Sequence, residues 1–355
     1  MHRRIPLVAL AAAATATALV VTACGSSGSS SSSGGGAAGI TTVTMMVGGI
    51  NKQIYQPYQL AQDLGFYKKY GVNMQLSTES AGGVGAEDAM ASGQVNMAGA
   101  WYVHTINFQQ KGKNVEDVVQ LSGAPGERIM CAKGSSITSP AQWRGKSVGV
   151  TDLGSGTDQL TLYLAARYHL TTKDFSRVAA GDGSTMVAAL QHGKIACGMT
   201  TQPTVTAIEK LGVGYPAFDL ATTSGVQKWL GGFVPTAGVL AQTSWVNANK
   251  GTVQKVVDAL VATMHWISTH SAADIANALP PDFVSNALIT KSEYITALAQ
   301  DKTQFLPDGM MPASGPQVVE AIGRLGGTIT GSVDLSTTYT NTFVIAANKA
   351  EGFTG

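Results

Sequence analysis

Short apolar runs alternate with amphipathic segments along most of this chain. Thr42–Val47, Asn73–Thr78 and Gln94–Ala98 are apolar enough to form buried strands. Tyr58–Tyr70 carries apolar residues at helical spacing and is followed by Gly71, so it is predicted to be an amphipathic helix that ends at a glycine. Strands that alternate with helices in this way are typical of a mainly parallel sheet.

The alternation continues through the middle of the chain, and the last third is predicted to be mostly helical. Further strands are expected at Val118–Leu121, Ile129–Ala132, Ser147–Val150, Phe175–Ala180 and Ile195–Met199. Further helices are expected at Ala86–Ala91, Gln159–His169, Thr185–Gln191, Thr204–Leu211, Thr252–Ser268, Ser271–Leu279, Lys291–Phe305, Gly315–Leu325 and Thr340–Lys349. We expect the last five helices to return the chain to the part of the fold in which it began.

One loop is rich in hydroxyl groups and glycines. Gly154–Thr157 (GSGT) lies between the predicted strand Ser147–Val150 and the predicted helix Gln159–His169. Such a loop presents the hydroxyls of Ser155 and Thr157, and the free amides of a helix start, at the carboxyl edge of a sheet. Small molecules commonly bind at this edge in α/β proteins. The loop matches neither the Walker motif nor GxGxxG.

The amino-terminal residues have the pattern of an export signal. Met1–Ala23 begins with basic residues and continues as an apolar run that ends at VTAC, which resembles a bacterial lipobox. Cys24 is therefore the candidate lipidation site. An ordinary signal peptide and an uncleaved membrane helix are the alternatives, although the run is short for a helix that needs about 20 residues to span a bilayer. Residues 24–39 continue as a serine- and glycine-rich stretch that is predicted to be a flexible tether.

The net charge and the cysteine content disfavour some classes of function. The formal net charge is +1, and removal of residues 1–23, which hold Arg3 and Arg4, leaves −1. This balance does not favour nucleic-acid binding, which needs a basic stripe. No cysteine or histidine cluster has metal-ligand spacing, so neither a metal nor a cofactor is expected. Cys131 and Cys197 could pair in an exported protein, but each lies in an apolar run, and buried free thiols are the preferred interpretation.

A short segment of the chain recurs at an offset of 100 residues. Ala89–Met97 and Ala189–Cys197 each contain a helix end, a glycine and a buried strand, and each follows a glycine-rich loop. Units of a helix, a glycine and a strand are common and look alike in sequence, so the match can also arise without a repeat. We favour a structural repeat, which would place one copy in each of two lobes.

Several of these motifs occur in a characteristic order. They are the helix, glycine and strand at Ala91–Asn96, the run Trp143–Val150 (WRGKSVGV), the loop Gly154–Thr157, and the second helix, glycine and strand at Ala188–Ala196. Together they resemble the substrate-binding proteins of ABC importers, in the branch that serves nitrate, sulfonates, taurine and related compounds. The resemblance covers roughly residues 42–266. It departs from the family at Asn96 and Ala196, where members often carry aspartate.

The resemblance implies a two-lobed α/β fold of the periplasmic-binding-protein type (type II), each lobe a mainly parallel sheet flanked by helices. Lobe 1 would comprise residues 40–126 and 235–355, and lobe 2 residues 127–234, with crossings near Pro125–Gly126 and Gly231–Pro235. Ligand would bind in the cleft, and the lobes would close over it by hinge motion. The implied partners are a small-molecule ligand, the ABC permease and ATPase subunits, and the outer face of the cell membrane, reached through the lipid anchor. We expect a monomer.

A cleft at the carboxyl ends of the strands would be lined by the loops that follow them. Glycines there let a ligand approach the backbone, hydroxyls and amides supply hydrogen bonds, and an aromatic pair supplies an apolar wall. The candidate ligand-binding residues are Asn51, Gly82, Gly83, Trp101, Tyr102, Ser155, Gly156, Thr157, Asp182, Thr201 and Gln202. The alternative is that the glycines only shape turns and that Ser155 and Thr157 only cap a helix.

Trp101 is the strongest of these candidates, because it is expected in a loop next to Gly99 rather than in an apolar stripe. His104 is left out, since a lone histidine is more often a satisfied or surface residue than a ligand contact. Lys52 is the only lysine or arginine in or beside the candidate loops. A small, neutral or singly charged organic molecule with a flat or apolar part is therefore predicted, either sulfonate-, nitrate- or taurine-like or a small ring compound.

Two other functions stay open. A lipoprotein that senses a ligand could use the same cleft without an importer. An exported enzyme is less favoured, because no GxSxG nucleophile elbow occurs and the set Ser155, Asp158 and His169 is poorly arranged for catalysis. A related enzyme branch that forms the thiamin pyrimidine has a cysteine-rich motif, which this chain lacks. No catalytic residue is therefore assigned.

Overall fold

The computed structural model describes residues 40–79 and 83–353, which belong to one compact unit, Ala38–Gly355. The predicted signal peptide, the tether with Cys24, and Gly82 lie outside the described residues. Among the described residues, no helix combines the length and apolar character needed to cross a membrane.

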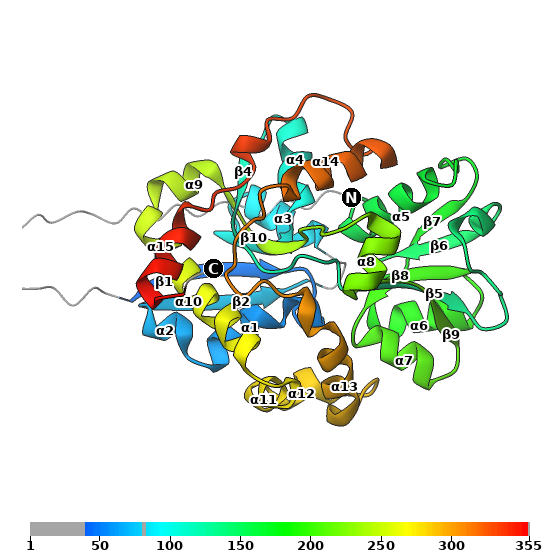
Figure 1. Cartoon of the computed structure of the whole chain (residues 1–355), viewed down its shortest axis with the longest axis horizontal. Helices are drawn as coiled ribbons and strands as arrows, with labels where there is room; N and C mark the ends of the chain where they lie inside the picture. Colours follow the sequence, from blue (N-terminus) through cyan, green and yellow to red (C-terminus); the bar gives the residue numbers. More distant parts are fainter. Residues whose placement is uncertain (1–39, 80–82, 354–355) are drawn as a thin grey trace, which may run out of the picture. The chain divides into compact units, whose positions relative to one another are not determined.

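Two five-stranded sheets form the framework of the unit (Figure 1). The strands are β1 (Thr41–Val47), β2 (Val72–Thr78), β3 (Met97–Trp101), β4 (Val115–Gln120), β5 (Glu127–Ala132), β6 (Ser147–Val150), β7 (Ser176–Ala179), β8 (Cys197–Thr201), β9 (Gly214–Leu220) and β10 (Ala237–Gln242). The first sheet has the order β2-β1-β3-β10-β4, and the second has the order β7-β6-β8-β5-β9.

Each sheet is mainly parallel and contains one antiparallel strand. In the first sheet β1 runs parallel to β2 and β3, while β10 runs antiparallel to β3 and β4. In the second sheet β6 runs parallel to β7 and β8, while β5 runs antiparallel to β8 and β9. β9 and β10 were not expected from the sequence pattern. The predicted class, two lobes each built on a mainly parallel sheet, is confirmed.

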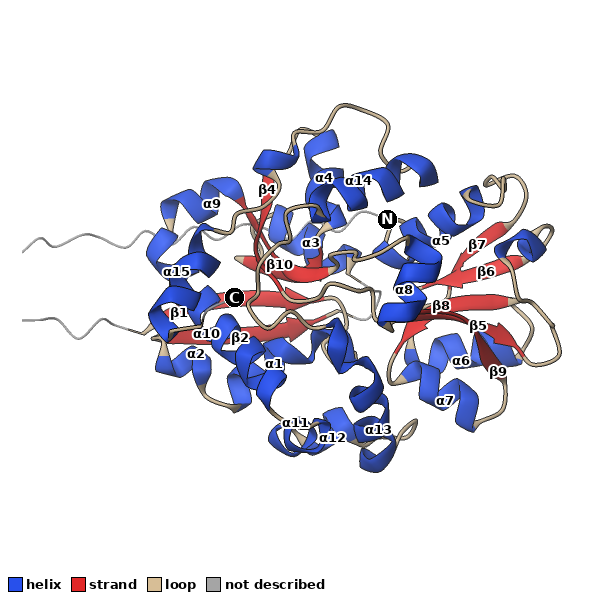
Figure 2. Cartoon of the chain, viewed as in Figure 1, coloured by secondary structure: helices blue, strands red, loops and turns tan. Residues whose placement is uncertain are grey.

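Helices cover both sheets (Figure 2). They are α1 (Gln56–Asp63), α2 (Phe66–Lys69), α3 (Val84–Ala91), α4 (Val103–Gln110), α5 (Gly156–Ala166), α6 (Gly183–Gln191), α7 (Thr204–Lys210), α8 (Thr223–Leu230), α9 (Thr243–Ala248), α10 (Lys250–Thr269), α11 (Ala272–Ala278), α12 (Pro281–Val284), α13 (Lys291–Asp301), α14 (Gly315–Gly326) and α15 (Thr342–Glu351). The single helix predicted over Tyr58–Tyr70 is wrong. Gly65 adopts a left-handed φ of 73° and separates α1 from α2.

The segment that recurs at an offset of 100 residues has the same local structure in both sheets. The carbonyl oxygen of Ala89 accepts from the amide of Gln94 at 2.9 Å, and that of Ala189 accepts from the amide of Lys194 at 2.9 Å. The intervening glycines, Gly93 and Gly193, have φ of 80° and 66°. In each case a glycine ends the helix and the next strand then enters the middle of its sheet, so the repeat is structural.

The chain passes between the sheets twice, and the two crossing segments lie side by side. One runs over residues 121–126 between β4 and β5, and the other over residues 231–236 between α8 and β10. The hydroxyls of Ser122 and Thr236 lie 2.7 Å apart, and that of Thr236 also donates to the carbonyl of Ala124 at 2.7 Å. The amide of Val234 donates to the carbonyl of Gly123 at 3.0 Å.

Cys131 and Cys197 form a disulfide, so the interpretation as free thiols is wrong. They are directly opposed residues on the antiparallel strands β5 and β8. Both side chains are fully buried. Their apolar surroundings are compatible with free thiols and with a disulfide. Only the register of the two strands brings the sulfurs together.

The carboxyl-terminal helices do not all return to the first sheet. α10 and α15 pack together beside β4, as expected, but α14 lies against α5 of the second sheet. A Cβ at Gly326 would lie only 3.1 Å from the backbone nitrogen of Tyr163. The segment after α14 is also bound to α4, because Gln110 accepts from the amide of Thr330 at 2.9 Å. α14 therefore bridges helices of the two lobes.

Candidate ligand-binding site

A small cavity lies where the carboxyl end of β3 faces the start of α5. Its volume is about 10 Å³, which is close to the room that one water molecule needs. Its lining comes from both lobes and consists of Lys52, Ile54, Tyr55, Gly83, Glu87, Trp101, His104, Glu127, Thr151, Gly156 and Thr157.

A larger and more open pocket, of about 1010 Å³, lies beside this cavity. It is lined by loops that follow β1, β2, β6 and β7 and by the first residues of α6 and α7. Lys52 and Thr151 line both spaces. Of the predicted site residues, Asn51 and Asp182 line this pocket.

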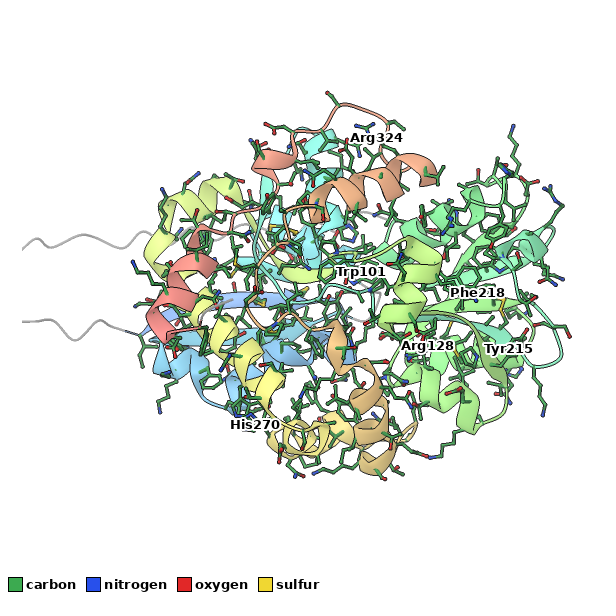
Figure 3. The ribbon with its side chains drawn as sticks, viewed as in Figure 1. Trp101, Arg128, Tyr215, Phe218, His270 and Arg324 are labelled. Carbon is green, nitrogen blue, oxygen red and sulfur yellow. A yellow bond between two sulfur atoms is a disulfide. The ribbon has the colours of Figure 1, made fainter. Side chains whose placement is uncertain are left out.

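Trp101 links the two lobes at the cavity, where Figure 3 labels it. Its indole ring lies over Gly156, because a Cβ at position 156 would come within 2.0 Å of its Cε3 atom. Trp101 is 6% exposed. The predicted position in a loop is wrong, since Trp101 is the last residue of β3 and Gly99 lies within the same strand.

Tyr102 does not share the wall that Trp101 forms. It is fully buried, and its hydroxyl lies 2.5 Å from that of Thr338. Its ring makes an edge contact with Tyr339. Tyr102 directly follows β3 and precedes α4, and its side chain enters the interior of the first lobe rather than the cavity. The expected aromatic pair is therefore a single tryptophan at this position.

Ser155 and Thr157 form a buried hydroxyl cluster with Thr151. Ser155 Oγ lies 2.8 Å from Thr157 Oγ1, and Thr151 Oγ1 lies 2.9 Å from Thr157 Oγ1. Ser155 Oγ also accepts from the amide of Asp158 at 3.3 Å, which caps α5. Thr157 and Gly156 line the cavity, whereas Ser155 lies beneath it. Ser155 therefore caps α5.

An ion pair joins the lobes at the edge of the cavity. Lys52 Nζ lies 3.0 Å from Asp182 Oδ2 and donates to the carbonyl of Gly48 at 2.9 Å. Beside it, the amide of Gln53 donates to the carbonyl of Gln202 at 3.0 Å. These contacts connect the loop after β1 with the loops after β7 and β8.

Thr201 and Gln202 use their side chains for internal contacts. Thr201 Oγ1 donates to the carbonyl of Gly126, at the first crossing, at 2.6 Å. Gln202 Oε1 accepts from the amide and hydroxyl of Thr206 in α7. Neither residue lines the cavity or the larger pocket beside it. Gly83, by contrast, lines the cavity at the start of α3, where its φ is 110°.

Glu87 and His104 form a buried pair that the sequence interpretation missed. Glu87 Oε2 lies 2.8 Å from His104 Nδ1, and both residues line the cavity. Burial raises the pKa of Glu87, while His104 lowers it. His104 was set aside as a lone histidine, but it lies three residues after Trp101 in the first turn of α4, which begins beside the cavity.

Glu127 is the second acidic residue of the cavity and was also missed. It is the first residue of β5, directly after the first crossing, and is 3% exposed. Burial raises the pKa of Glu127 to about 8, against the smaller lowering effect of Lys52. Its Oε2 atom has no hydrogen-bond partner. Among residues 40–79 and 83–353, no group of His, Cys, Asp or Glu is arranged to hold a metal ion.

The family of the chain follows from its sequence once this geometry is known. The family model described as NMT1/THI5 like matches residues 53–273, which is more than half of the chain. The chain belongs to the NMT1/THI5-like family. The matched range includes every described residue that lines the cavity except Lys52. A curated relative, YtlA of Bacillus subtilis (strain 168), whose name proposes a binding protein, is 21% identical over 64% of this chain and 67% of its own length.

Several solved structures are similar to this NMT1/THI5-like chain. A protein of Bordetella bronchiseptica RB50 covers 88% of this chain and 98% of its own, at 26% identity and a TM-score of 0.80. The periplasmic nitrate-binding protein NrtA of Synechocystis PCC 6803 covers 88% and 89%, at 15% identity and a TM-score of 0.70. The alkanesulfonate-binding protein SsuA of Xanthomonas axonopodis pv. citri, bound to MOPS, covers 86% and 99%, at 17% identity and a TM-score of 0.65. The predicted resemblance is thereby confirmed.

Proposed function

We propose that this chain is the extracytoplasmic substrate-binding component of an ABC importer and that it holds a small molecule between its lobes. The observation that carries the proposal is the cavity at the carboxyl ends of the strands, lined from both sheets by Trp101 on one side and by Gly156 and Thr157 on the other. Ligands of open α/β sheets bind at this edge. Family membership supports the proposal, as do the names of its nitrate- and sulfonate-binding structural neighbours.

Binding of a ligand in the cavity between Trp101 and Gly156 requires the lobes to separate and close again. A ligand pocket typically needs about 300 Å³ or more, whereas the cavity measures about 10 Å³. The two adjacent crossing segments are the natural hinge, and we place the lobe boundaries there, at residues 40–126 with 235–355 and at residues 127–234. Closure would form the Lys52–Asp182 ion pair and bring Trp101 over Gly156.

The closed form is what an ABC permease with its ATPase subunits would recognise. We place the protein outside the cell membrane as a monomer, held by a lipid on Cys24, because the leader and lipobox pattern accords with that location. The chain would deliver its ligand rather than convert it.

A thermal-unfolding screen of residues 38–355 tests the proposal. The compounds are nitrate, taurine, ethanesulfonate, MOPS, aromatic acids and small ring amides. A ligand that binds only the folded state stabilises it by about 2.7 kcal/mol at a concentration of 100 times Kd. We expect a saturable rise in Tm with one chemical class, and we expect Trp101→Ala to abolish that rise relative to its own unliganded Tm. If no compound raises Tm and one of them is turned over, the chain is an enzyme and the proposal fails.

A further inference from the structure

Two residues that line the cavity between the lobes each carry a carboxylate oxygen without a hydrogen-bond partner. Glu87 Oε1 and Glu127 Oε2 are both buried and make no hydrogen bond. The two residues are 5% and 3% exposed, and they come from different lobes, on α3 and β5. A buried carboxylate oxygen without a donor costs free energy, and a bound group that donates hydrogen bonds would recover it.

The cationic side chains beside the cavity are already engaged. Lys52 pairs with Asp182 at 3.0 Å, and His104 pairs with the other oxygen of Glu87 at 2.8 Å. Arg128, next to Glu127 in the chain, makes two bonds to Asp301, at 2.7 and 2.8 Å. These partners leave acceptor atoms, rather than free positive charge, facing the cavity.

Two aromatic residues also line the cavity. Tyr55 and Trp101 both line the cavity, and both are almost fully buried. Lys52 Nζ lies 5.9 Å from the centre of the Tyr55 ring. A flat group in contact with such rings gains apolar contact, and a cationic group also interacts favourably with ring faces.

On the basis of the proposed function, we infer that the ligand presents a nitrogen-bearing, hydrogen-bond-donating head group, such as an amidinium, ammonium or amide, to Glu87 and Glu127. The site would then select against the nitrate and sulfonate anions named for its structural neighbours. An anion in this cavity would place its oxygens against the acceptor atoms Glu87 Oε1 and Glu127 Oε2, and each of these residues would repel it when that residue is ionised.

Three ring compounds of the same size test this inference by isothermal titration calorimetry with residues 38–355. Benzamidine, benzamide and benzoate carry a cationic, a neutral donating and an anionic head group, and nitrate and ethanesulfonate are added for comparison. The variants are Glu87→Gln and Glu127→Gln. Asp88→Asn is the matched control, because Asp88 is an exposed neighbour of Glu87 on the same helix.

We expect benzamidine or benzamide to bind at least tenfold more tightly than benzoate. Each glutamine variant should weaken benzamidine binding at least tenfold, while Asp88→Asn leaves it unchanged. Tighter binding of benzoate, nitrate or ethanesulfonate, retained in both glutamine variants but lost in Trp101→Ala, would overturn the inference and leave the proposed function intact. Failure of benzamidine and benzamide to bind would also overturn the inference. If, in addition, no compound of the thermal screen binds, the proposed function fails as well.

Discussion

The indole ring of Trp101, at the end of β3 in the first sheet, lies directly over Gly156, at the start of α5 in the second. A Cβ at Gly156 would lie 2.0 Å from Cε3 and 2.4 Å from Cδ2 of the ring. Contacts this short do not occur in proteins, so the lobes reach this distance only because residue 156 has no side chain. The close approach of the two lobes at the cavity therefore depends on a single hydrogen atom.

We predict that Gly156→Ala weakens ligand binding at least tenfold and leaves the free energy of unfolding within about 1 kcal/mol of the wild type. Gly156 lies in a helix, where alanine is well tolerated, so the added methyl group acts on the contact between lobes. Calorimetric titration measures the binding, and Gly251→Ala is the control, since a Cβ there meets nothing within 4 Å. Wild-type affinity in Gly156→Ala would contradict the prediction.

The ion pair between Lys52 and Asp182 should stabilise the closed arrangement more than the fold. We predict that Asp182→Asn weakens ligand binding about three- to tenfold, because it removes a partly buried charge pair that joins the lobes. Glu320→Gln is the control, since Glu320 pairs with Arg324 at 2.6 Å within the single helix α14 and that pair does not join the lobes. Titrations at low and high salt check the assignment. An unchanged affinity in Asp182→Asn would show that the pair does not contribute to closure.

The stability of the protein should fall as pH rises from about 5 to about 8. The pKa of Glu127 is about 8 in the folded protein and about 4.3 when unfolded, so between these values the folded state binds the additional proton. Ionisation of Glu127 in the folded protein therefore lowers the free energy of unfolding by up to about 5 kcal/mol. The full reduction is present above pH 8. Burial is the main cause of the raised pKa of Glu127, while Lys52 and Arg128 lower this pKa and Asp182 raises it.

Chemical denaturation at pH 5, 7 and 9 measures this dependence. Glu127→Gln should be more stable than the wild type at pH 9 and should lose most of the difference at pH 5, because the amide cannot ionise. Asp88→Asn is the control, since Asp88 is an exposed carboxylate on α3. If the free energy of unfolding changed equally with pH in the wild type and in Glu127→Gln, the pH dependence would come from other titratable groups.

The disulfide closes a loop of 66 residues within the second sheet. We predict that reduction, or replacement of both cysteines by alanine, lowers the free energy of unfolding by about 2–4 kcal/mol, because the open chain gains conformational entropy when unfolded. Guanidinium denaturation with and without reductant measures the loss. The alanine variant should not respond to reductant. Equal midpoints for the oxidised and reduced wild type would contradict the prediction.

The overall fold could be predicted because its signals are local. Gly93 and Gly193 each end a helix before a central strand. The recurrence of this segment at an offset of 100 residues indicated two similarly built lobes. β9 escaped prediction because Pro216 and other polar or small residues interrupt its apolar pattern. The Cys131–Cys197 bond escaped because it depends on the register of two strands that are far apart in sequence.

The site was only partly predictable. Trp101 lines the cavity, whereas Tyr102 does not, because β3 extends to residue 101 and the next side chain turns into the lobe interior. Glu87 and Glu127 were missed because a buried, unpaired carboxylate oxygen runs against the usual preference of acidic residues for solvent. Such atoms become visible only once their surroundings are known.

Small-angle X-ray scattering of residues 38–355, with and without the compound that raises Tm most, tests the central claim that the ligand is held between the lobes. We predict that the unliganded protein has a larger radius of gyration than the structure described above and that saturating ligand reduces it to the value calculated from that structure. Gly156→Ala should stay at the larger value. A ligand that raises Tm, leaves the radius of gyration unchanged and binds Trp101→Ala as tightly as the wild type would contradict the account, because it would bind outside the cleft.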